Sequence, residues 1–341
     1  MQSNIELHDL AAKNLHEAVP YAVITPPGYQ NSTSFPLCLM LMGGGGSRQN
    51  LVDCQPLFEA WWAEGSLPPM IIATPSPGMS YYLEDPNGNI RWDSFLAEEF
   101  VPHLRATCNI RGDRFSTAIT GISIGGYGAL KTAFARPDQF GVVAAMQPML
   151  EPGFHDSDIC ARNRLYHIAG GPPELVGPAR DPKLFEANNP ANRLRTNAGA
   201  IRDTGLAIYI DAGDEDFLNA HDGAEFLHRV LWDLDISHEY HLVRCGDHGG
   251  PSMRPRMRSM YAWVGSAMSA FKSKTQKPTA EERAVSAWID GGMAGSPPVA
   301  APTSQEFVRI LRAQFKPLRD RAAASDATTN RRYGVFPKLS E

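Results

Sequence analysis

The sequence predicts an α/β fold, in which a mostly parallel central sheet has helices on both faces. Two observations predict it. First, short apolar runs that end at Gly or Pro alternate with stretches whose apolar residues recur at helical spacing, and this alternation is typical of parallel sheets connected by helices. Second, 43% of the 341 residues are hydrophobic and 20% are charged, which is the composition of a globular protein with a core large enough for a sheet.

The predicted elements follow one another in a regular order. Strands are predicted at residues 21–24, 36–42, 69–74, 114–122, 140–146, 206–211 and 237–243, with the run at 36–42 clearly apolar. Helical spacing indicates helices at residues 51–62, 92–107, 126–135, 217–234 and 257–271. Because two parallel strands need a crossover connection, which is usually a helix, this order favours parallel pairing.

Residues 1–271 contain all of these elements and are expected to form one domain. Within it, residues 151–202 are rich in Pro, Gly, Asn, Asp and Arg, and we expect them to form a small insertion or lid. Residues 272–341 are predicted to be a linker and a C-terminal helical extension, in which residues 304–318 are amphipathic. An isolated helix of this length is marginally stable. We therefore expect it to dock, either on a second copy in a homo-oligomer or over the functional site.

Charge and hydropathy argue against two classes of partner. The formal net charge is −5, with 37 acidic and 32 basic residues, so no basic surface for nucleic acid is predicted. No apolar run approaches the roughly 18 residues that are needed to cross a bilayer, and no polybasic segment is present to hold the chain on one. We therefore expect neither nucleic acid nor a membrane as a partner.

The cysteines and the N-terminus favour a cytoplasmic location. The cysteines are scattered and form no CxxC pair, at Cys38, Cys54, Cys108, Cys160 and Cys245. Neither a disulfide framework nor a zinc site is therefore indicated. Free thiols fit a reducing compartment, and the polar N-terminus lacks the basic and apolar segments of a secretory signal.

The strongest functional signal is the sequence Gly121-Ile122-Ser123-Ile124-Gly125. It is a G-x-S-x-G motif between a predicted strand and a predicted helix, which is the context that a nucleophile elbow requires. The N-terminus of that helix also favours the negative charge that develops near the serine. A glycine-rich turn that merely contains a serine is the alternative, and the flanking strand and helix disfavour it. Ser123 is therefore the predicted nucleophile.

A serine nucleophile needs a base, and in sites of this kind the chain order is Ser, then Asp or Glu, then His. Asp211, Asp214 and Asp216 follow a late predicted strand. Asp216 is the favoured acid and Asp214 is the second choice, because both lie on the loop, whereas the sheet constrains Asp211. The structural alternative for either loop acid is an N-cap of the following helix.

His248 is the predicted base, because it lies beside glycines on a loop that directly follows the last predicted strand. His238 and His241 are three residues apart on a strand and therefore face opposite ways. His221 and His228 fall within a predicted helix and are interpreted as ordinary, partly exposed residues.

Four glycines, Gly43 to Gly46, follow an early predicted strand. Glycine lets backbone N–H groups approach a substrate closely. The N–H of Gly44 and that of Ile124, the residue after the nucleophile, are the predicted oxyanion donors. Gly43 and Gly45 are expected to border the substrate. A phosphate-binding loop is the alternative, but no Gly-Lys-Ser/Thr follows the glycines.

The substrate walls are predicted from side chains that follow strands on the side where such sheets bind ligands. Tyr81, Tyr82 and Trp92 lie on or near one such loop, and Met149 follows the strand after the nucleophile helix. Packing in the core is the alternative for each of them. Together they would suit a medium-sized ester that is partly aromatic or apolar.

Three stretches carry a family resemblance: Trp92 to Leu96, Gly121 to Leu130, and Arg136 to Gly141. In these stretches the chain resembles the α/β-hydrolase esterases that include S-formylglutathione hydrolase (esterase D), enterochelin-esterase-like proteins and mycobacterial mycolyltransferases, and the match runs over about residues 21–264. The resemblance implies an α/β-hydrolase fold for residues 1–271. The family's acid loop is similar to residues 213–218, which supports Asp216 as the acid.

The residues and the resemblance together predict a serine hydrolase. A carboxylesterase that cleaves a small to medium carboxylic ester, through a Ser-His-Asp triad and an acyl-enzyme intermediate, is favoured. Ile124 and Met42 differ from the methionine and histidine that are common in relatives, so S-formylglutathione specificity is not carried over. A thioesterase of that type, an acyltransferase and a non-catalytic binding protein of the same fold are the alternatives. No metal or organic cofactor is implied.

Overall fold

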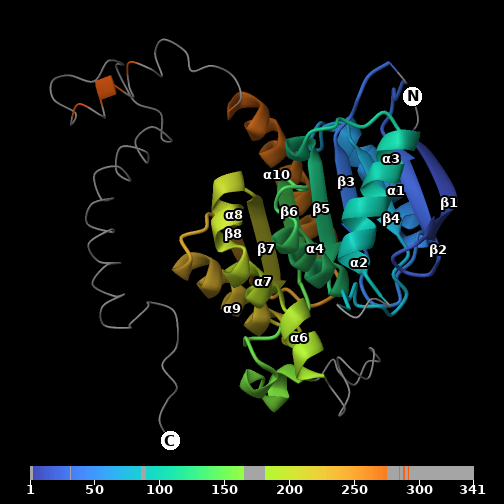
Figure 1. Ribbon diagram of the computed structural model, residues 1–341. Helices are drawn as coiled ribbons and strands as arrows, with labels where there is room; N and C mark the ends of the chain where they lie inside the picture. The colour runs from blue at the N-terminus through green and yellow to red at the C-terminus, as the bar shows by residue number, and fades with distance from the viewer. Residues whose placement is uncertain are drawn as a thin grey trace, which may run out of the picture. The chain divides into compact units, whose positions relative to one another are not determined.

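An eight-stranded sheet carries the fold in the computed structural model (Figure 1). The strands lie in the order β1-β2-β4-β3-β5-β6-β7-β8. Their bounds are β1 Asn4–Ala12, β2 Glu17–Thr25, β3 Leu37–Leu41, β4 Ile71–Pro75, β5 Thr117–Ile122, β6 Val142–Met146, β7 Ala207–Gly213 and β8 Glu239–Val243. All pairs from β4 to β8 are parallel, and only the pairs β1–β2 and β2–β4 are antiparallel. The predicted mostly parallel sheet is confirmed.

The structure describes residues 3–30, 32–85, 90–164 and 181–274, together with 284, 287, 288 and 291. The chain divides into two compact units, Met1–Ala270 and Phe271–Glu341. The predicted amphipathic segment at residues 304–318 lies outside the described residues, so its docking stays a prediction. No helix in the described part of the chain is both long enough and apolar enough to cross a membrane.

Helices cover both faces of the sheet, as predicted (Figure 1). Their bounds are α1 Gln49–Ala63, α2 Trp92–Ser94, η1 Phe95–Phe100, α3 Val101–Thr107, η2 Arg114–Ser116, α4 Ile124–Ala135, η3 Asp156–Asp158, α6 Pro182–Asn188, α7 Pro190–Thr196, α8 Ala198–Thr204, α9 Ala220–Asp233 and α10 Met253–Lys274. Side chains alternate between the faces. On β5, Ile119 packs in the main apolar cluster, while the hydroxyl of Thr120 lies 3.2 Å from that of Tyr261 on α10.

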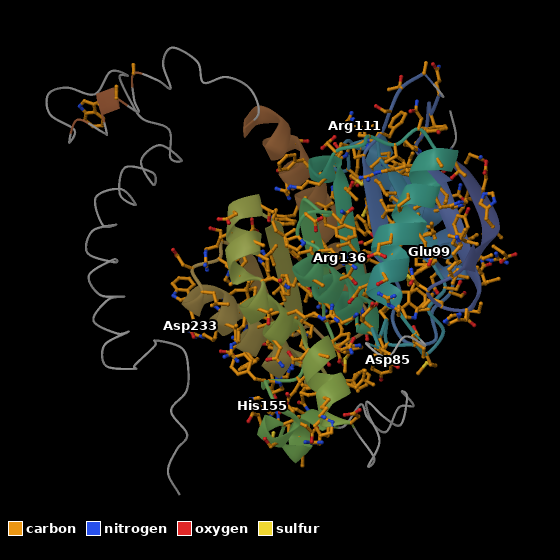
Figure 2. All side chains as sticks on the ribbon, in the orientation of Figure 1. Asp85, Glu99, Arg111, Arg136, His155 and Asp233 are labelled. Atoms are coloured by element: carbon orange, nitrogen blue, oxygen red, sulfur yellow. The ribbon has the colours of Figure 1, made fainter. Side chains whose placement is uncertain are left out.

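Of the two strands in the antiparallel pair β1–β2, only β2 was predicted, from the strand at residues 21–24. β1 is almost entirely exposed, so it lacks the buried apolar run that β3 to β6 have. Glu99 of η1 ties the β1–β2 turn to the domain, because its carboxylate accepts from the backbone N–H of Lys13 at 2.8 Å and of Asn14 at 2.7 Å (Figure 2). Each charge-assisted hydrogen bond of this kind contributes more than a neutral one.

Among its described residues, the predicted insertion carries the short turn η3 and the helices α6, α7 and α8, of which α8 ends just beyond it at Thr204. Helix α7 packs against α4, and Leu194 and Ile201 join the main apolar cluster. Residues 190–202 are therefore part of the helix layer on the sheet. Residues 165–180 are not described, so the lid remains a prediction. Helices α6 and α7 each begin with a capping residue followed by proline. The side chains of Asp181 and Asn189 accept hydrogen bonds from backbone N–H groups in the first turns of these two helices.

Candidate active site

Ser123 stands on a sharp turn between β5 and α4, with φ 59° and ψ −123°. This conformation is costly for a residue with a side chain, and the neighbouring backbone imposes it. The N–H of Ser123 donates to the carbonyl of Met146 at 3.1 Å. A Cβ on Gly121 would lie 2.0 Å from the Gly125 oxygen, and one on Gly125 would lie 2.1 Å from the Leu41 oxygen. Only glycine fits at these two positions of the motif.

Ser123, His248 and Asp216 form one continuous hydrogen-bonded chain. His248 Nε2 lies 2.9 Å from Ser123 Oγ, and His248 Nδ1 lies 2.7 Å from Asp216 Oδ2. The Asp216 side chain is fully buried, and its second oxygen accepts from the N–H of Leu218 at 2.8 Å. Since a carboxylate accepts from Nδ1–H, Nε2 of the neutral ring is left as an acceptor for the serine proton. The structure brings together the three residues that the sequence nominated.

The other two aspartates of the acid loop have different partners. Asp211 forms a buried ion pair with Arg256 of α10, whose Nη2 lies 2.6 Å from Asp211 Oδ1. Burial raises the pKa of Asp211 above its ordinary value, although the guanidinium opposes the shift. Asp214 accepts from the backbone N–H of Cys245 at 2.6 Å. The carboxylates of Asp211 and Asp214 are thus occupied by other groups.

Three residues that the sequence analysis did not nominate support the His248 loop. Asp247 Oδ1 accepts from the N–H of His248 at 2.6 Å and from that of Phe217 at 3.1 Å, which joins the two loops. Arg256 donates to the Asp247 carbonyl at 2.9 Å, and the amide of Gln147 donates to the His248 carbonyl. No sequence signal identifies Gln147 or Arg256, because Gln147 and its partner His248 are 101 residues apart, and Arg256 and its partner Asp211 are 45 residues apart.

The glycine loop after β3 lies against the nucleophile. A Cβ on Gly43 would lie 3.3 Å from Ser123 Cβ, and one on Gly44 would lie 2.8 Å from Ile124 Cδ1. The N–H of Gly45 donates to the Gly78 carbonyl at 3.2 Å, and so it is already occupied. Within the described part of the chain, neither the N–H of Gly44 nor the N–H of Ile124 donates to a backbone acceptor, so both are open to a ligand.

Two of the predicted substrate-wall residues lie in the core. Tyr82 is fully buried, and its hydroxyl accepts from the N–H of Met42 at 2.9 Å and donates to the Met42 carbonyl at 3.1 Å. Trp92 is also buried and packs edge-on against Tyr82, with ring centroids 5.0 Å apart. Both side chains therefore have partners within the protein, and their contact with substrate stays a prediction.

Tyr81 and Met149, the other two predicted wall residues, are also buried. Tyr81 adopts a positive φ of 54°. Met149 lies directly behind the nucleophile, because its N–H donates to the Ser123 carbonyl at 3.1 Å. Their contact with substrate stays a prediction.

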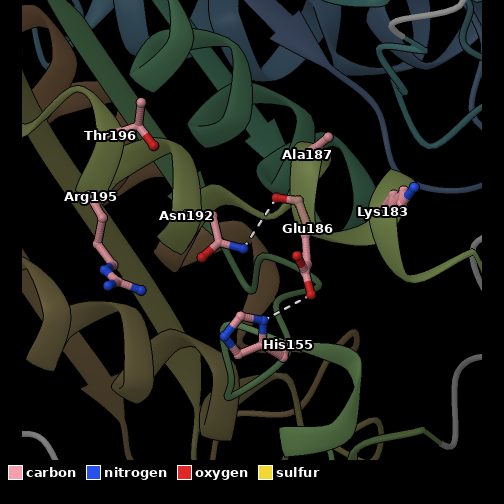
Figure 3. A pocket seen from close by; sticks show the side chains of 7 residues that line it. All are labelled: His155, Lys183, Glu186, Ala187, Asn192, Arg195 and Thr196. Carbon is pink, nitrogen blue, oxygen red and sulfur yellow. Dashed lines mark hydrogen bonds and ion pairs between the residues drawn. The ribbon is translucent and has the colours of Figure 1, made fainter.

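A separate hollow of about 670 Å³ lies among the short helices of residues 151–202 (Figure 3). It is lined by His155, Lys183, Glu186, Ala187, Asn192, Arg195 and Thr196. His155 Nδ1 lies 2.8 Å from Glu186 Oε1. None of the predicted site residues lines this hollow. Among the described residues, no three His, Cys, Asp or Glu side chains are placed to hold a metal ion.

The sheet and the strand-turn-helix at Ser123 define the class, which is an α/β-hydrolase-like enzyme. A family model described as "Putative esterase" matches residues 12–249, and the chain belongs to this family. The family resemblance in the motifs is therefore confirmed. An acetyl esterase of Caldicellulosiruptor saccharolyticus is 26% identical over 151 residues, which is 42% of this chain and 53% of the relative. The chain thus matches about half the length of that relative.

Solved structures of esterases share the fold. A ferulic acid esterase superposes with a TM-score of 0.63 at 20% identity, over 78% of this chain and 100% of that one. The fluorophosphonate-binding serine hydrolase F of Staphylococcus aureus gives 0.62 at 16% identity, over 78% and 99%. An S-formylglutathione hydrolase from Agrobacterium tumefaciens gives 0.59 at 17% identity, over 78% and 95%. At these identities the likeness concerns the fold.

Proposed function

We propose that the protein is a carboxylesterase that cleaves small to medium carboxylic esters through a triad of Ser123, His248 and Asp216. The observation that carries the proposal is the chain of two hydrogen bonds, 2.7 Å from Asp216 to His248 and 2.9 Å from His248 to Ser123. Both lie within the reach that proton transfer requires. A binding protein of the same fold needs neither this alignment nor a strained serine.

In the first half of the reaction, Ser123 Oγ attacks the ester carbonyl while His248 Nε2 takes the serine proton. Asp216 accepts from Nδ1–H and stabilises the imidazolium. The N–H groups of Ile124 and Gly44 are the proposed donors to the oxyanion. When the tetrahedral intermediate collapses, the bond to the alcohol oxygen breaks and His248 returns its proton to that oxygen. The alcohol leaves, and the acyl group stays on Ser123.

In the second half, water takes the place of the alcohol. His248 removes a proton from the water as it attacks the acyl-enzyme, and the same N–H groups hold the oxyanion. Collapse of this intermediate breaks the bond to Ser123, whose oxygen receives the proton, and the carboxylic acid leaves. Each oxyanion donor of this kind contributes about 10²- to 10³-fold to the rate.

Labelling with a fluorophosphonate and turnover of p-nitrophenyl acetate and butyrate test the nucleophile. We expect the wild-type protein to be labelled and active, and Ser123→Ala to lose labelling and at least about 10⁴-fold in kcat. Ser259→Ala, at an exposed serine of α10, is the matched control and should behave as wild type. Turnover that survives in Ser123→Ala would show that the chemistry lies elsewhere.

A further inference from the structure

Phe217 is a large apolar side chain that is exposed beside the imidazole of His248. Its exposed fraction is 64%. Its ring lies edge-on to the His248 ring, with centroids 5.8 Å apart and planes at 72°. Removing an apolar side chain of this size from water is favourable. An exposed phenylalanine at a candidate active site is therefore a surface on which a ligand gains affinity.

The backbone on both sides fixes the position of Phe217. Asp216, which precedes it, is held by His248, and its other oxygen accepts from the N–H of Leu218. The N–H of Phe217 itself donates to Asp247 at 3.1 Å. Leu218 packs against the main apolar cluster, while Phe217 stays exposed. The outward ring is therefore part of the same structure that positions the imidazole.

The chemistry says which part of the substrate lies next to this ring. His248 Nε2 returns its proton to the oxygen of the leaving alcohol, so the leaving group must lie beside the imidazole. Phe217 is the exposed apolar side chain whose ring packs against this imidazole, so it is available to a group bonded to that oxygen.

We infer that Phe217 determines specificity for the alcohol part of the ester, and that it favours apolar and aromatic alcohols. This inference rests on the proposed function. Aromatic rings gain from edge-on or offset contact with one another beyond the area that they bury. A small alkyl leaving group reaches too little of the ring to gain from it. The preferred substrate class is therefore an ester of an aryl or arylalkyl alcohol.

A second exposed apolar residue lies at the other side of the site. Met79 is 42% exposed, and a Cβ on Gly44 would lie 3.8 Å from both its Sδ and its Cε. Methionine adapts its shape to apolar ligands and makes favourable contacts with aromatic rings. Met79 therefore adds an apolar border near the proposed oxyanion donor.

The test keeps the acyl group constant and varies the alcohol. For Phe217→Ala we expect kcat/KM to fall about tenfold on benzyl acetate, mainly through KM, and less than twofold on ethyl acetate. Phe217→Tyr keeps the ring and should restore benzyl acetate turnover. Trp232→Ala is the matched control, because Trp232 is equally exposed but lies near the far end of α9, roughly 20 Å along the helix axis.

The outcomes are distinct. An equal loss on both esters in Phe217→Ala would show that the ring acts through His248 and would overturn the inference, as would no loss on either. Equal melting temperatures and fluorophosphonate labelling rates would show that the variant is folded with an intact nucleophile. Failure of the proposed function has a different signature, because Ser123→Ala would then keep its activity on both esters.

Discussion

Tyr82 joins the two backbone segments on which the proposed chemistry depends. Its hydroxyl makes two hydrogen bonds to Met42, at the start of the glycine loop that leads to Gly44. Its ring faces helix α4, where a Cβ on Gly128 would lie 2.7 Å from the ring. Tyr82 thus holds the proposed oxyanion loop in register with the helix that begins behind Ser123. We therefore expect Tyr82 to contribute to catalysis by positioning this loop.

We expect Tyr82→Phe to lower kcat about tenfold with little change in KM. Without the hydroxyl, the N–H and the carbonyl of Met42 lose their partner, which costs about 1–3 kcal/mol of stability and lets Gly44 move. Because an oxyanion donor acts mainly in the transition state, the loss belongs in kcat. Steady-state kinetics on p-nitrophenyl acetate and thermal unfolding of the same samples measure the two effects.

Tyr261→Phe is the control for this prediction. Tyr261 is equally buried, and its hydroxyl lies 3.2 Å from that of Thr120 on the opposite face of the sheet. We expect this variant to melt at a lower temperature and to keep its kcat. If both variants lost kcat in proportion to stability, Tyr82 would be a general core residue.

Asp211, Asp214 and Asp216 show how far single residues could be predicted from the sequence. Its position on the loop and the family resemblance favoured Asp216, and in the structure it is the one that lies against His248. The sequence could not exclude the other two, because the groups that occupy them, Arg256 and the N–H of Cys245, lie 45 and 31 residues away. Long-range partners of this kind decide which carboxylate is left for the imidazole.

Strands and helices could be predicted where their burial leaves a recognisable arrangement of apolar residues in the sequence. β3 to β6 are buried along their whole length, and each was predicted from its apolar run. β1 escaped prediction because it is an exposed edge strand, paired only with β2. The helices α6, α7 and α8 have seven residues each. A segment of two turns is too short for an apolar period to be recognised.

Helix α9 meets strand β8 through two histidines. His228 Nδ1 lies 2.7 Å from His238 Nε2, and the His228 ring stacks on Tyr240 with centroids 4.6 Å apart. Burial, together with the neighbouring His238, lowers the pKa of His228 to about 4. Burial also lowers the pKa of His238. Both imidazoles are therefore neutral in the folded protein at pH values where an unfolded chain already takes up protons.

This pair predicts a loss of stability in mild acid. Below about pH 6.5 the histidines of the unfolded chain bind protons that the same histidines of the folded chain do not. The free energy of unfolding should therefore fall as the pH drops from about 6.5 to about 4, and it should change little through this pair below about pH 4. Thermal unfolding in steps over this range measures the slope. His228→Phe keeps the stacking on Tyr240 without the titrating ring and should show a smaller decrease. Identical slopes would assign the acid sensitivity to other groups.

The compact unit Met1–Ala270 holds all that the proposed reaction requires. It contains the whole sheet, the main apolar cluster, and Ser123, Asp216 and His248. Its last helix, α10, supplies Arg256, which links β7 to the His248 loop. Any shortened chain must therefore keep α10 if it is to keep the geometry of the imidazole.

We expect a chain that ends after Lys274 to fold and to keep kcat/KM on p-nitrophenyl acetate within about twofold of the full chain, because it retains the core and every proposed catalytic group. Thermal unfolding and kinetics measure this, and light scattering on both chains tests whether residues 275–341 mediate the homo-oligomer predicted from the amphipathic segment. A smaller particle with unchanged kinetics would assign the extension to association. A tenfold or greater loss of turnover in a shortened chain that still melts cooperatively would contradict the expectation, and would place the extension in the reaction cycle.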